Sequence, residues 1–286
     1  MDAALPTMPL ISGRTALVAH LGYPTESFKA PMIYNPWFAA RGIDAVVVPM
    51  GVRADDYPAF LPLVFRLSNI RGALVTMPHK VRTMGLVDHV TPTAAIAGAT
   101  NAIRAEPDGR LTADQFDGEG FVRGVLRKGQ PIAGRRALVV GCGGVGSAIA
   151  ASLARAGVAE LALQDPNTAG MEGLAARLSQ HYPALRLNLG HGDPAGFDIV
   201  VNATPLGMRP GDPLPMDVDR IDLGAFVGEV VLSSEMTPFL RAAAARGCRW
   251  QVGTDMLFEM IPAYLEFFGL GTATADELRA TARIAY

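Results

Sequence analysis

Cysteine, clusters of basic residues and long apolar runs are all scarce in this sequence. Only Cys142 and Cys248 occur, in no metal-ligand spacing, which fits a reducing compartment better than a disulfide scaffold. The net charge of −2 and the lack of a lysine and arginine cluster argue against nucleic acid and anionic membranes as partners. No segment approaches the roughly 18 to 20 apolar residues of a membrane span, and the N-terminal stretch has no basic leader before an apolar run. We therefore expect a cytoplasmic monomer or homodimer that acts on a small molecule and holds no metal ion.

Apolar residues are abundant instead and make up 50% of the 286 residues, enough for a large core and two domains. Apolar runs such as TALVAHLG and DAVVVPM alternate with helix-length segments, and a second such series begins near residue 136 with RALVVG. This alternation predicts βαβ units and an α/β fold with mainly parallel sheets. Pro31 and Gly42 suit the start and the stop of one helix. The polar stretch AEPDGRLTADQFDGEG is expected to be the crossover between the domains.

A glycine motif follows the first strand of the second series. The segment VVGCGGVG places Gly141, Gly143 and Gly146 as G-x-G-x-x-G at the start of a predicted helix. Gly141 permits a tight turn, Gly143 lets the backbone approach a pyrophosphate, and Gly146 lets helix and strand pack closely. The helix N-terminus adds unpaired N–H groups and a positive dipole. The motif predicts a dinucleotide site, with a plain glycine-rich turn or a methyltransferase loop as alternatives.

The next strand of this series ends at Asp165. This is close to the ~20 residues beyond the glycine motif at which a carboxylate hydrogen-bonds a ribose 2′-hydroxyl. A carboxylate there also repels a 2′-phosphate, and no arginine follows in QDPNTAG. We therefore expect NAD to be preferred over NADP.

In the first series, the stretch GALVTMPHK ends an apolar strand with Lys80. Oxidation of an alcohol by a hydride acceptor requires a group that takes the hydroxyl proton. A lysine can do so if burial or a positive neighbour lowers its pKa to roughly 7 to 8. Asp117 in QFDGEGF is the best candidate for a carboxylate that holds such a lysine. From spacing alone, a solvated charge is the simpler interpretation of Lys80, and His79 fits packing or the surface better than catalysis.

Several ordered motifs resemble those of the shikimate and quinate dehydrogenase family, and the resemblance spans nearly the whole chain. GYPTESFKAPMIYN is similar to the family's G-x-P-x-x-H-S-x-S-P-x-x-H-N, and GALVTMPHK to G-x-N-V-T-x-P-x-K. GATNAI resembles G-A-x-N-T, and QFDGEGF resembles N-T-D-G-x-G-F. The second half continues the series with GCGGVG, NATPLGM, TPFL and GTDMLFEM, the last similar to G-x-x-M-L-x-x-Q.

This resemblance implies an architecture and a set of functional residues. It implies a substrate domain over residues 1–116, completed by C-terminal helices over 253–286, and a Rossmann-type dinucleotide domain over 117–252. Lys80 and Asp117 fall on the family's catalytic pair, while Asn101 and Thr76 fall on residues that contact the substrate. By the resemblance, Lys80 lies in an interdomain cleft, bonded to the alcohol that loses its hydride.

The substrate motifs also depart from the family pattern. Residues at the family's polar positions have become apolar, and each exchange removes a polar partner. Phe28 and Ala30 stand where the family has two serines for the substrate carboxylate, Phe116 replaces a threonine, Leu232 a tyrosine and Met260 a glutamine. Thr25 and Ser27 offer another hydroxyl pair nearby, displaced by three residues. A hydrogen bond to a charged ligand group is worth roughly 1.5 to 3 kcal/mol, so we expect a pocket retargeted to a less polar cyclic or aromatic alcohol or ketone.

The dinucleotide side implied by the resemblance is that of the NAD-preferring quinate and shikimate branch. Asn167 is expected to add a ribose contact, Thr204 and Pro205 to lie along the cofactor, and Met208 and Leu257 to flank the nicotinamide or to pack in the core. The expected cofactor-binding residues are Gly141, Gly143, Gly144, Val145, Gly146, Asp165, Asn167, Thr204, Pro205, Leu206, Met208, Gly253 and Leu257.

The sequence therefore predicts an NAD-dependent oxidoreductase that moves a hydride between NAD and a ring alcohol or ketone. Lys80 and Asp117 handle the proton, Asn101 orients the hydroxyl, and domain closure excludes water. One alternative is a quinate or shikimate dehydrogenase proper, in which Thr25 and Ser27 replace the missing serines. The other is a non-catalytic NAD-binding regulator, which has no need of Lys80 and Asp117.

Overall fold

The structure is a computed structural model that describes residues 10–286. The chain divides into two compact units. The first unit runs to Val90 and also contains Thr100–Asp114 and Ile261–Ala285, and the second contains Thr91–Ala99, Gln115–Met260 and Tyr286. This division differs from the predicted domain bounds chiefly at residues 91–99 and 253–260, which belong to the second unit.

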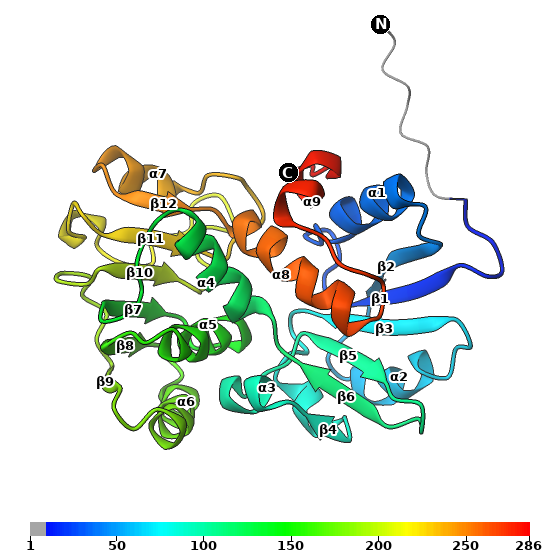
Figure 1. Ribbon diagram of the computed structural model, residues 1–286. Coiled ribbons are helices and arrows are strands. Elements are labelled where there is room, and N and C mark those ends of the chain that lie inside the picture. Colours follow the sequence, from blue (N-terminus) through cyan, green and yellow to red (C-terminus); the bar gives the residue numbers. More distant parts are fainter. Residues whose placement is uncertain (1–9) are drawn as a thin grey trace, which may run out of the picture. The chain divides into compact units, whose positions relative to one another are not determined.

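The first unit is built on a mixed sheet of six strands in the order β2-β1-β3-β5-β6-β4 (Figure 1). Its strands are β1 (Ala16–Gly22), β2 (Ala45–Gly51), β3 (Ile70–Val75), β4 (His89–Val90), β5 (Ala102–Ala105) and β6 (Leu111–Asp114). Its helices are α1 (Pro31–Arg41), α2 (Tyr57–Val64), the 3-10 turn η1 (Arg82–Gly85) and α9 (Ala275–Thr281). As predicted, Pro31 begins α1, and Gly42 ends it with a φ of 65°.

The second unit is built on six parallel strands in the order β12-β11-β10-β7-β8-β9. They are β7 (Arg136–Val140), β8 (Glu160–Gln164), β9 (Arg186–Leu189), β10 (Ile199–Asn202), β11 (Phe226–Glu229) and β12 (Arg249–Gln251). Its helices are α3 (Pro92–Ala97), α4 (Asp117–Arg127), α5 (Gly144–Arg155), α6 (Thr168–His181), η2 (Val218–Arg220) and α7 (Pro238–Ala245), while α8 (Gly253–Phe267) begins here and continues into the first unit. Read from the β9 edge, the order is β9-β8-β7-β10-β11-β12. This is the strand order of doubly wound dinucleotide-binding sheets, which confirms the predicted fold class.

Alternation along β7 explains how this sheet is covered on both faces. Ala137 and Val139 lie in one buried apolar cluster, while Leu138 and Val140 lie in another. Because successive side chains of a strand point to opposite faces, the two clusters are the two sides of one sheet. Among residues 10–286, no helix is both long and apolar enough to cross a membrane.

One segment differs from the sequence-based expectation and another agrees with it. Helix α3 belongs to the second unit because it packs against α5 and α6, where the Arg177 guanidinium donates to the carbonyls of Ile96 (2.9 Å) and Ala97 (3.1 Å). The expected crossover lies within the predicted stretch, because a segment of the first unit ends at Asp114 and the second unit resumes at Gln115. It is short, since β6 ends at Asp114 and α4 begins at Asp117. Gly109 of this stretch lies in the turn between β5 and β6 with a φ of 85°, whereas Gly118 and Gly120 lie within α4.

Candidate active site

The glycine motif forms a tight turn between β7 and α5. Gly141 has a φ of +99°, a conformation that residues with a Cβ rarely adopt. A Cβ on Gly146 would collide with the Gly141 carbonyl, so helix and strand approach as closely as the motif predicts. Around Gly143, which precedes the helix, nothing lies within 4 Å of the place that a Cβ would take. The open side at Gly143 and the amides of the first turn of α5 therefore fit a dinucleotide pyrophosphate.

Asp165 supports this turn from the end of β8. One carboxylate oxygen accepts a hydrogen bond from the Cys142 amide (2.5 Å) and the other accepts one from the Asn167 amide (2.7 Å). Asn167 in turn caps α6, because its side-chain oxygen accepts a hydrogen bond from the Gly170 amide (3.1 Å). Both oxygens of Asp165 therefore hold backbone turns.

The loop after β10 lies against the same turn. A Cβ on Gly141 would be 2.7 Å from the Ala203 carbonyl group. The Asn202 side chain shapes the loop, because its oxygen accepts hydrogen bonds from the Thr204 amide (3.0 Å) and hydroxyl (2.7 Å) while its nitrogen donates to the Leu206 carbonyl (3.1 Å). Thr204 and Leu206 are thus brought to the strand ends where the sheet order reverses, the expected place for a dinucleotide.

Other predicted residues of the second unit lie on or next to α4, on α8, and in the segments after β10 and β11. Asp117 is buried at the start of α4, and its amide donates to the Gln115 side chain (2.8 Å). Met260 packs against α4, where a Cβ on Gly120 would be 2.7 Å from the Met260 Cβ. The remaining predicted residues here are the buried Phe116 and Leu257, the partly exposed Leu232 and Met208, the exposed Pro205, and Gly253, which packs on the Val231 backbone.

Backbone pairing in the first unit brings Thr76, Lys80 and Asn101 together. The Lys80 carbonyl accepts a hydrogen bond from the Thr100 amide (3.0 Å), and the Asn101 carbonyl accepts one from the Val75 amide (2.8 Å). Asn101 is fully buried, and Lys80 is only 9% exposed. The interpretation of Lys80 as a solvated surface charge is therefore wrong. Lys80 and Asp117 belong to different units, so their pairing stays a prediction.

Phe28 occupies the position of the first expected serine and packs at the end of β1. A Cβ on Gly22 would be 2.8 Å from the tip of the Phe28 ring and would clash with the Thr76 methyl group. Only a glycine at residue 22 therefore lets Phe28 and Thr76 lie so close together. Ala30 is buried at the second position, and Ser27 is partly exposed nearby.

Two buried histidines lie near this cluster, and sequence reasoning singled out only one of them. His79 stacks on Tyr57 (3.8 Å between ring centroids) and its Nε2 hydrogen-bonds the Val52 carbonyl (2.9 Å), so it is the expected packing residue. His20 on β1 stacks on Phe28 (4.1 Å) and was missed. The sequence feature that could have identified it is a titratable residue inside the apolar run LVAHLG.

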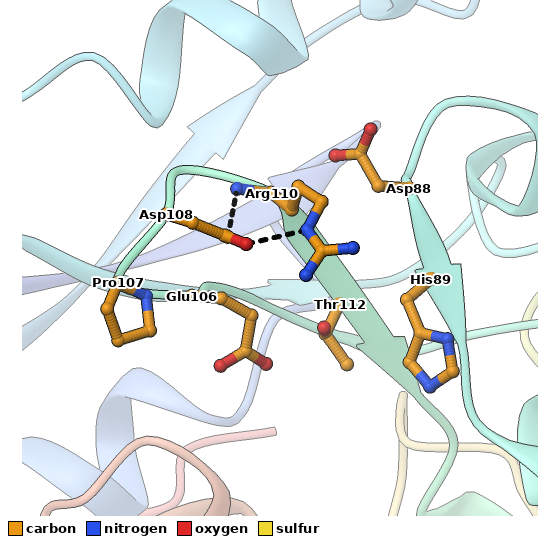
Figure 2. A pocket seen from close by; sticks show the side chains of 7 residues that line it. All are labelled: Asp88, His89, Glu106, Pro107, Asp108, Arg110 and Thr112. Atoms are coloured by element: carbon orange, nitrogen blue, oxygen red, sulfur yellow. Dashed lines mark hydrogen bonds and ion pairs between the residues drawn. The ribbon is translucent and has the colours of Figure 1, made fainter.

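The first unit also has a cavity of about 540 Å³, and none of the predicted site residues lines it. It is lined by Asp88, His89, Glu106, Pro107, Asp108, Arg110 and Thr112 (Figure 2). Its charged groups already have partners: Asp108 accepts a hydrogen bond from Arg110 (2.7 Å), and Asp88 accepts one from the Leu111 amide (2.7 Å). Within the described part of the chain, no group of three or more His, Cys, Asp or Glu side chains is placed to hold a metal ion.

Comparisons with known proteins agree with this geometry. The family model of the shikimate dehydrogenase substrate binding domain matches residues 21–103, and that of the ThiF family matches residues 126–176. The shikimate dehydrogenase (NADP(+)) of Rubrobacter xylanophilus is 38% identical over 258 residues, which are 88% of this chain and 89% of that protein.

Two solved structures extend the likeness. Quinate dehydrogenase from Corynebacterium glutamicum in complex with NAD is 29% identical with a TM-score of 0.81, covering 93% of this chain and 98% of that one. Ligand-free 5-ketofructose reductase of Gluconobacter sp. strain CHM43 is 25% identical with a TM-score of 0.82, covering 94% and 98%.

The curated relatives correct the expected cofactor. The Rubrobacter protein and four further curated relatives are named for NADP, so the expected preference for NAD over NADP is wrong. The structure gives the physical reason. The Asp165 carboxylate that suggested a ribose contact is bonded to the amides of Cys142 and Asn167, so its place at the strand end does not identify the ribose.

The two α/β units, the glycine turn, the buried Lys80 and Asn101, and a 38% identical relative that matches almost end to end all agree. The chain belongs to the shikimate/quinate dehydrogenase family and is an oxidoreductase of that family.

Proposed function

We propose that this protein moves a hydride between a nicotinamide dinucleotide, NADP by the names of its relatives, and an alcohol or ketone that lacks the carboxylate of shikimate. The single observation that carries the proposal is the Phe28 ring beside Thr76, with Ala30 at the second serine position. Neither side chain offers a hydrogen bond to a carboxylate, and the loss of even one such bond costs roughly tenfold or more in affinity.

A relative with an uncharged substrate supports the proposal. The name of 5-ketofructose reductase specifies a ketose, which has no carboxylate, and that protein covers 94% of this chain. We therefore take a polyhydroxylated ketone or the matching alcohol as the substrate class. The retained Lys80, Asp117 and Asn101 favour a working enzyme over a protein that only binds the dinucleotide.

The chemistry divides between the cofactor and the chain. NADP, when bound, supplies the hydride acceptor or donor. Lys80 takes the hydroxyl proton during oxidation and returns it during reduction, and Asp117 holds the lysine and the reacting hydroxyl in place. The Asn101 side chain orients the same hydroxyl. In the first unit, the buried Phe28 ring beside Thr76 limits the access of water, which strengthens electrostatic interactions there.

The test is a comparison of initial rates at 340 nm. NADPH oxidation is measured with 5-ketofructose, and NADP reduction with shikimate, quinate and uncharged cyclic alcohols. NAD(H) is run in parallel with each. We expect higher kcat/KM on an uncharged compound than on shikimate. A wild-type protein that oxidises shikimate or quinate best would overturn the proposal and leave Thr25 and Ser27 as the carboxylate site.

The catalytic part is tested with Lys80→Ala. We expect a rate loss of at least about a hundredfold, the lower range for a positioned proton-transfer group, while NADP still binds in a fluorescence titration. Lys128→Ala is the matched control, because its ammonium pairs with Asp255 (3.0 Å) in the second unit. Full activity of Lys80→Ala would contradict the assigned proton transfer.

A further inference from the structure

His20 is a titratable residue in an otherwise apolar stretch of β1. Its neighbours Val18, Ala19 and Leu21 are apolar and almost fully buried, and His20 itself is 8% exposed. In the parallel pairing of β1 with β3, His20 is in register with Leu74, two residues before Thr76. Paired residues of neighbouring strands share one face of the sheet, so the imidazole extends from the same face as Leu74.

One face of the imidazole is packed against an aromatic ring, and one of its two nitrogens has no polar partner among the described residues. Its ring stacks on Phe28 with 4.1 Å between centroids and 27° between planes. The Nδ1 atom is buried and has no hydrogen-bond partner among residues 10–286. The Nδ1 of His79 is buried without a partner among these residues as well, but the other nitrogen of that ring, Nε2, bonds the Val52 carbonyl. A buried polar atom without a partner is costly, and a bound molecule can supply the partner that His20 Nδ1 lacks among the described residues.

The electrostatic environment fixes the form of the ring. Burial, and then the positive charge of Lys80, lower the pKa of His20 to about 3. The imidazole is therefore neutral at physiological pH, with one ring nitrogen as a donor and the other as an acceptor. A neutral ring balances no negative charge, so it suits a hydroxyl or carbonyl group better than a carboxylate.

We propose that His20 is a substrate-binding residue of this chain, whose Nδ1 hydrogen-bonds an uncharged hydroxyl or carbonyl group of the substrate beside Lys80. The inference rests on the proposed function and deepens it. The stacked pair of Phe28 and His20 forms an apolar wall with one neutral polar atom, in place of a pair of hydroxyls. This wall selects polyhydroxylated compounds without a carboxylate.

Kinetics of two His20 variants test the assignment. His20→Leu keeps the apolar volume and removes both nitrogens, whereas His20→Asn keeps a neutral donor and acceptor. With whichever of 5-ketofructose and shikimate the wild type turns over better, we expect His20→Leu to lower kcat/KM roughly tenfold, as for one lost hydrogen bond, and His20→Asn to recover part of it. His191→Leu is the control, because His191 also packs against a phenylalanine, Phe197 (5.7 Å), but in the second unit.

Nitrogen NMR of the imidazoles supplies a readout that needs no turnover. The His20 signals are assigned by their loss in His20→Leu, and each probe compound is added to the NADP-loaded wild type. We expect the His20 signals to shift and those of His191 to stay. His20 signals that no probe moves, or a His20→Leu variant as active as the wild type, overturn the inference. A preference of the wild type for shikimate contradicts the proposed function instead, and the His20 variants are then compared on shikimate.

Discussion

Glu229 is, like His20, a buried titratable residue. It lies at the end of β11 and is linked through Asn202 to the loop after β10. It is fully buried, and one carboxyl oxygen accepts a hydrogen bond from the Thr237 hydroxyl (2.9 Å). Burial raises the pKa of Glu229 to about 7, while hydrogen bonds from Thr237 and Asn202 oppose this rise. Because Asn202 also positions Thr204, the charge of Glu229 affects the loop that is predicted to contact the cofactor.

We predict that Glu229→Gln changes how stability depends on pH. Between the model-peptide pKa of 4.5 and the folded-state value of about 7, the folded protein holds more protons than the unfolded chain. The free energy of unfolding of the wild type therefore falls as pH rises through this window. Glutamine removes the dependence, and the difference between the two profiles approaches about 3 kcal/mol above pH 7. Urea unfolding at pH 5 and pH 8 measures it, with the exposed Glu235→Gln as control. Profiles that stay parallel contradict the prediction.

At this scale, the sequence identified residues by type and motif but could not show what each one touches. Gly141 and Gly146 were predictable because their backbone geometry permits little else. Asp165 was assigned to a ribose because a carboxylate at a strand end looks the same in sequence whether it faces a ligand or the amides of Cys142 and Asn167. His20 was missed because only its register with Leu74 and its stacking on Phe28 reveal its surroundings.

At the scale of elements, helix α4 shows how glycine can mislead a prediction. Gly118 and Gly120 belong to the predicted crossover stretch, which is rich in residues typical of turns, but both lie within α4. A Cβ on Gly118 would collide with the backbone carbonyl of Ala148 on α5, and one on Gly120 would be 2.6 Å from the Met256 carbonyl on α8. Alternation and apolar runs predicted the strands β7, β8 and β10 and the helices α5 and α6 of this unit. The close approach of three helices was not predictable, because it depends on residues far apart in the chain.

We predict that Gly118→Ala destabilises the protein although alanine is the better helix former. The added methyl group meets backbone that cannot rotate away, so the free energy of unfolding should fall by about 2 kcal/mol, as expected for overpacking. Gly173→Ala is the matched control within α6. Its Cβ would meet only the flexible Arg177 side chain at 3.5 Å, so we expect a gain of about 0.5 to 1 kcal/mol. Denaturant unfolding measures both, and a Gly118→Ala variant as stable as the wild type or more stable would show that α4 tolerates the methyl group.

At the scale of the whole chain, the last residues complete the first unit. Helix α9 packs against α1, as seen in Figure 1, and the Arg283 amide donates to the Met32 carbonyl (2.8 Å). The buried Lys29, which lies between Phe28 and Ala30, donates a hydrogen bond to the Ala285 carbonyl. No local pattern predicts contacts over more than 250 residues, and only the family resemblance suggested that the C-terminal helices return to the substrate domain.

We predict that Lys29→Met loosens the C-terminal segment while leaving dinucleotide binding intact. Methionine fills a similar volume but cannot donate to the Ala285 carbonyl, so the segment loses an attachment made by a charged donor. Amide exchange of Arg283 and Ala285 should speed up about tenfold, because these amides open locally rather than by global unfolding. Exchange in α5 should not change, because α5 belongs to the second unit. Lys128→Met controls for the loss of one lysine charge.

Unchanged exchange at Ala285 would mean that the Arg283 bond to Met32 and the packing of α9 hold the segment without Lys29. Faster exchange, together with a raised KM and an unchanged Kd for NADP, would show that the end of the chain holds the Phe28 segment in place for the substrate.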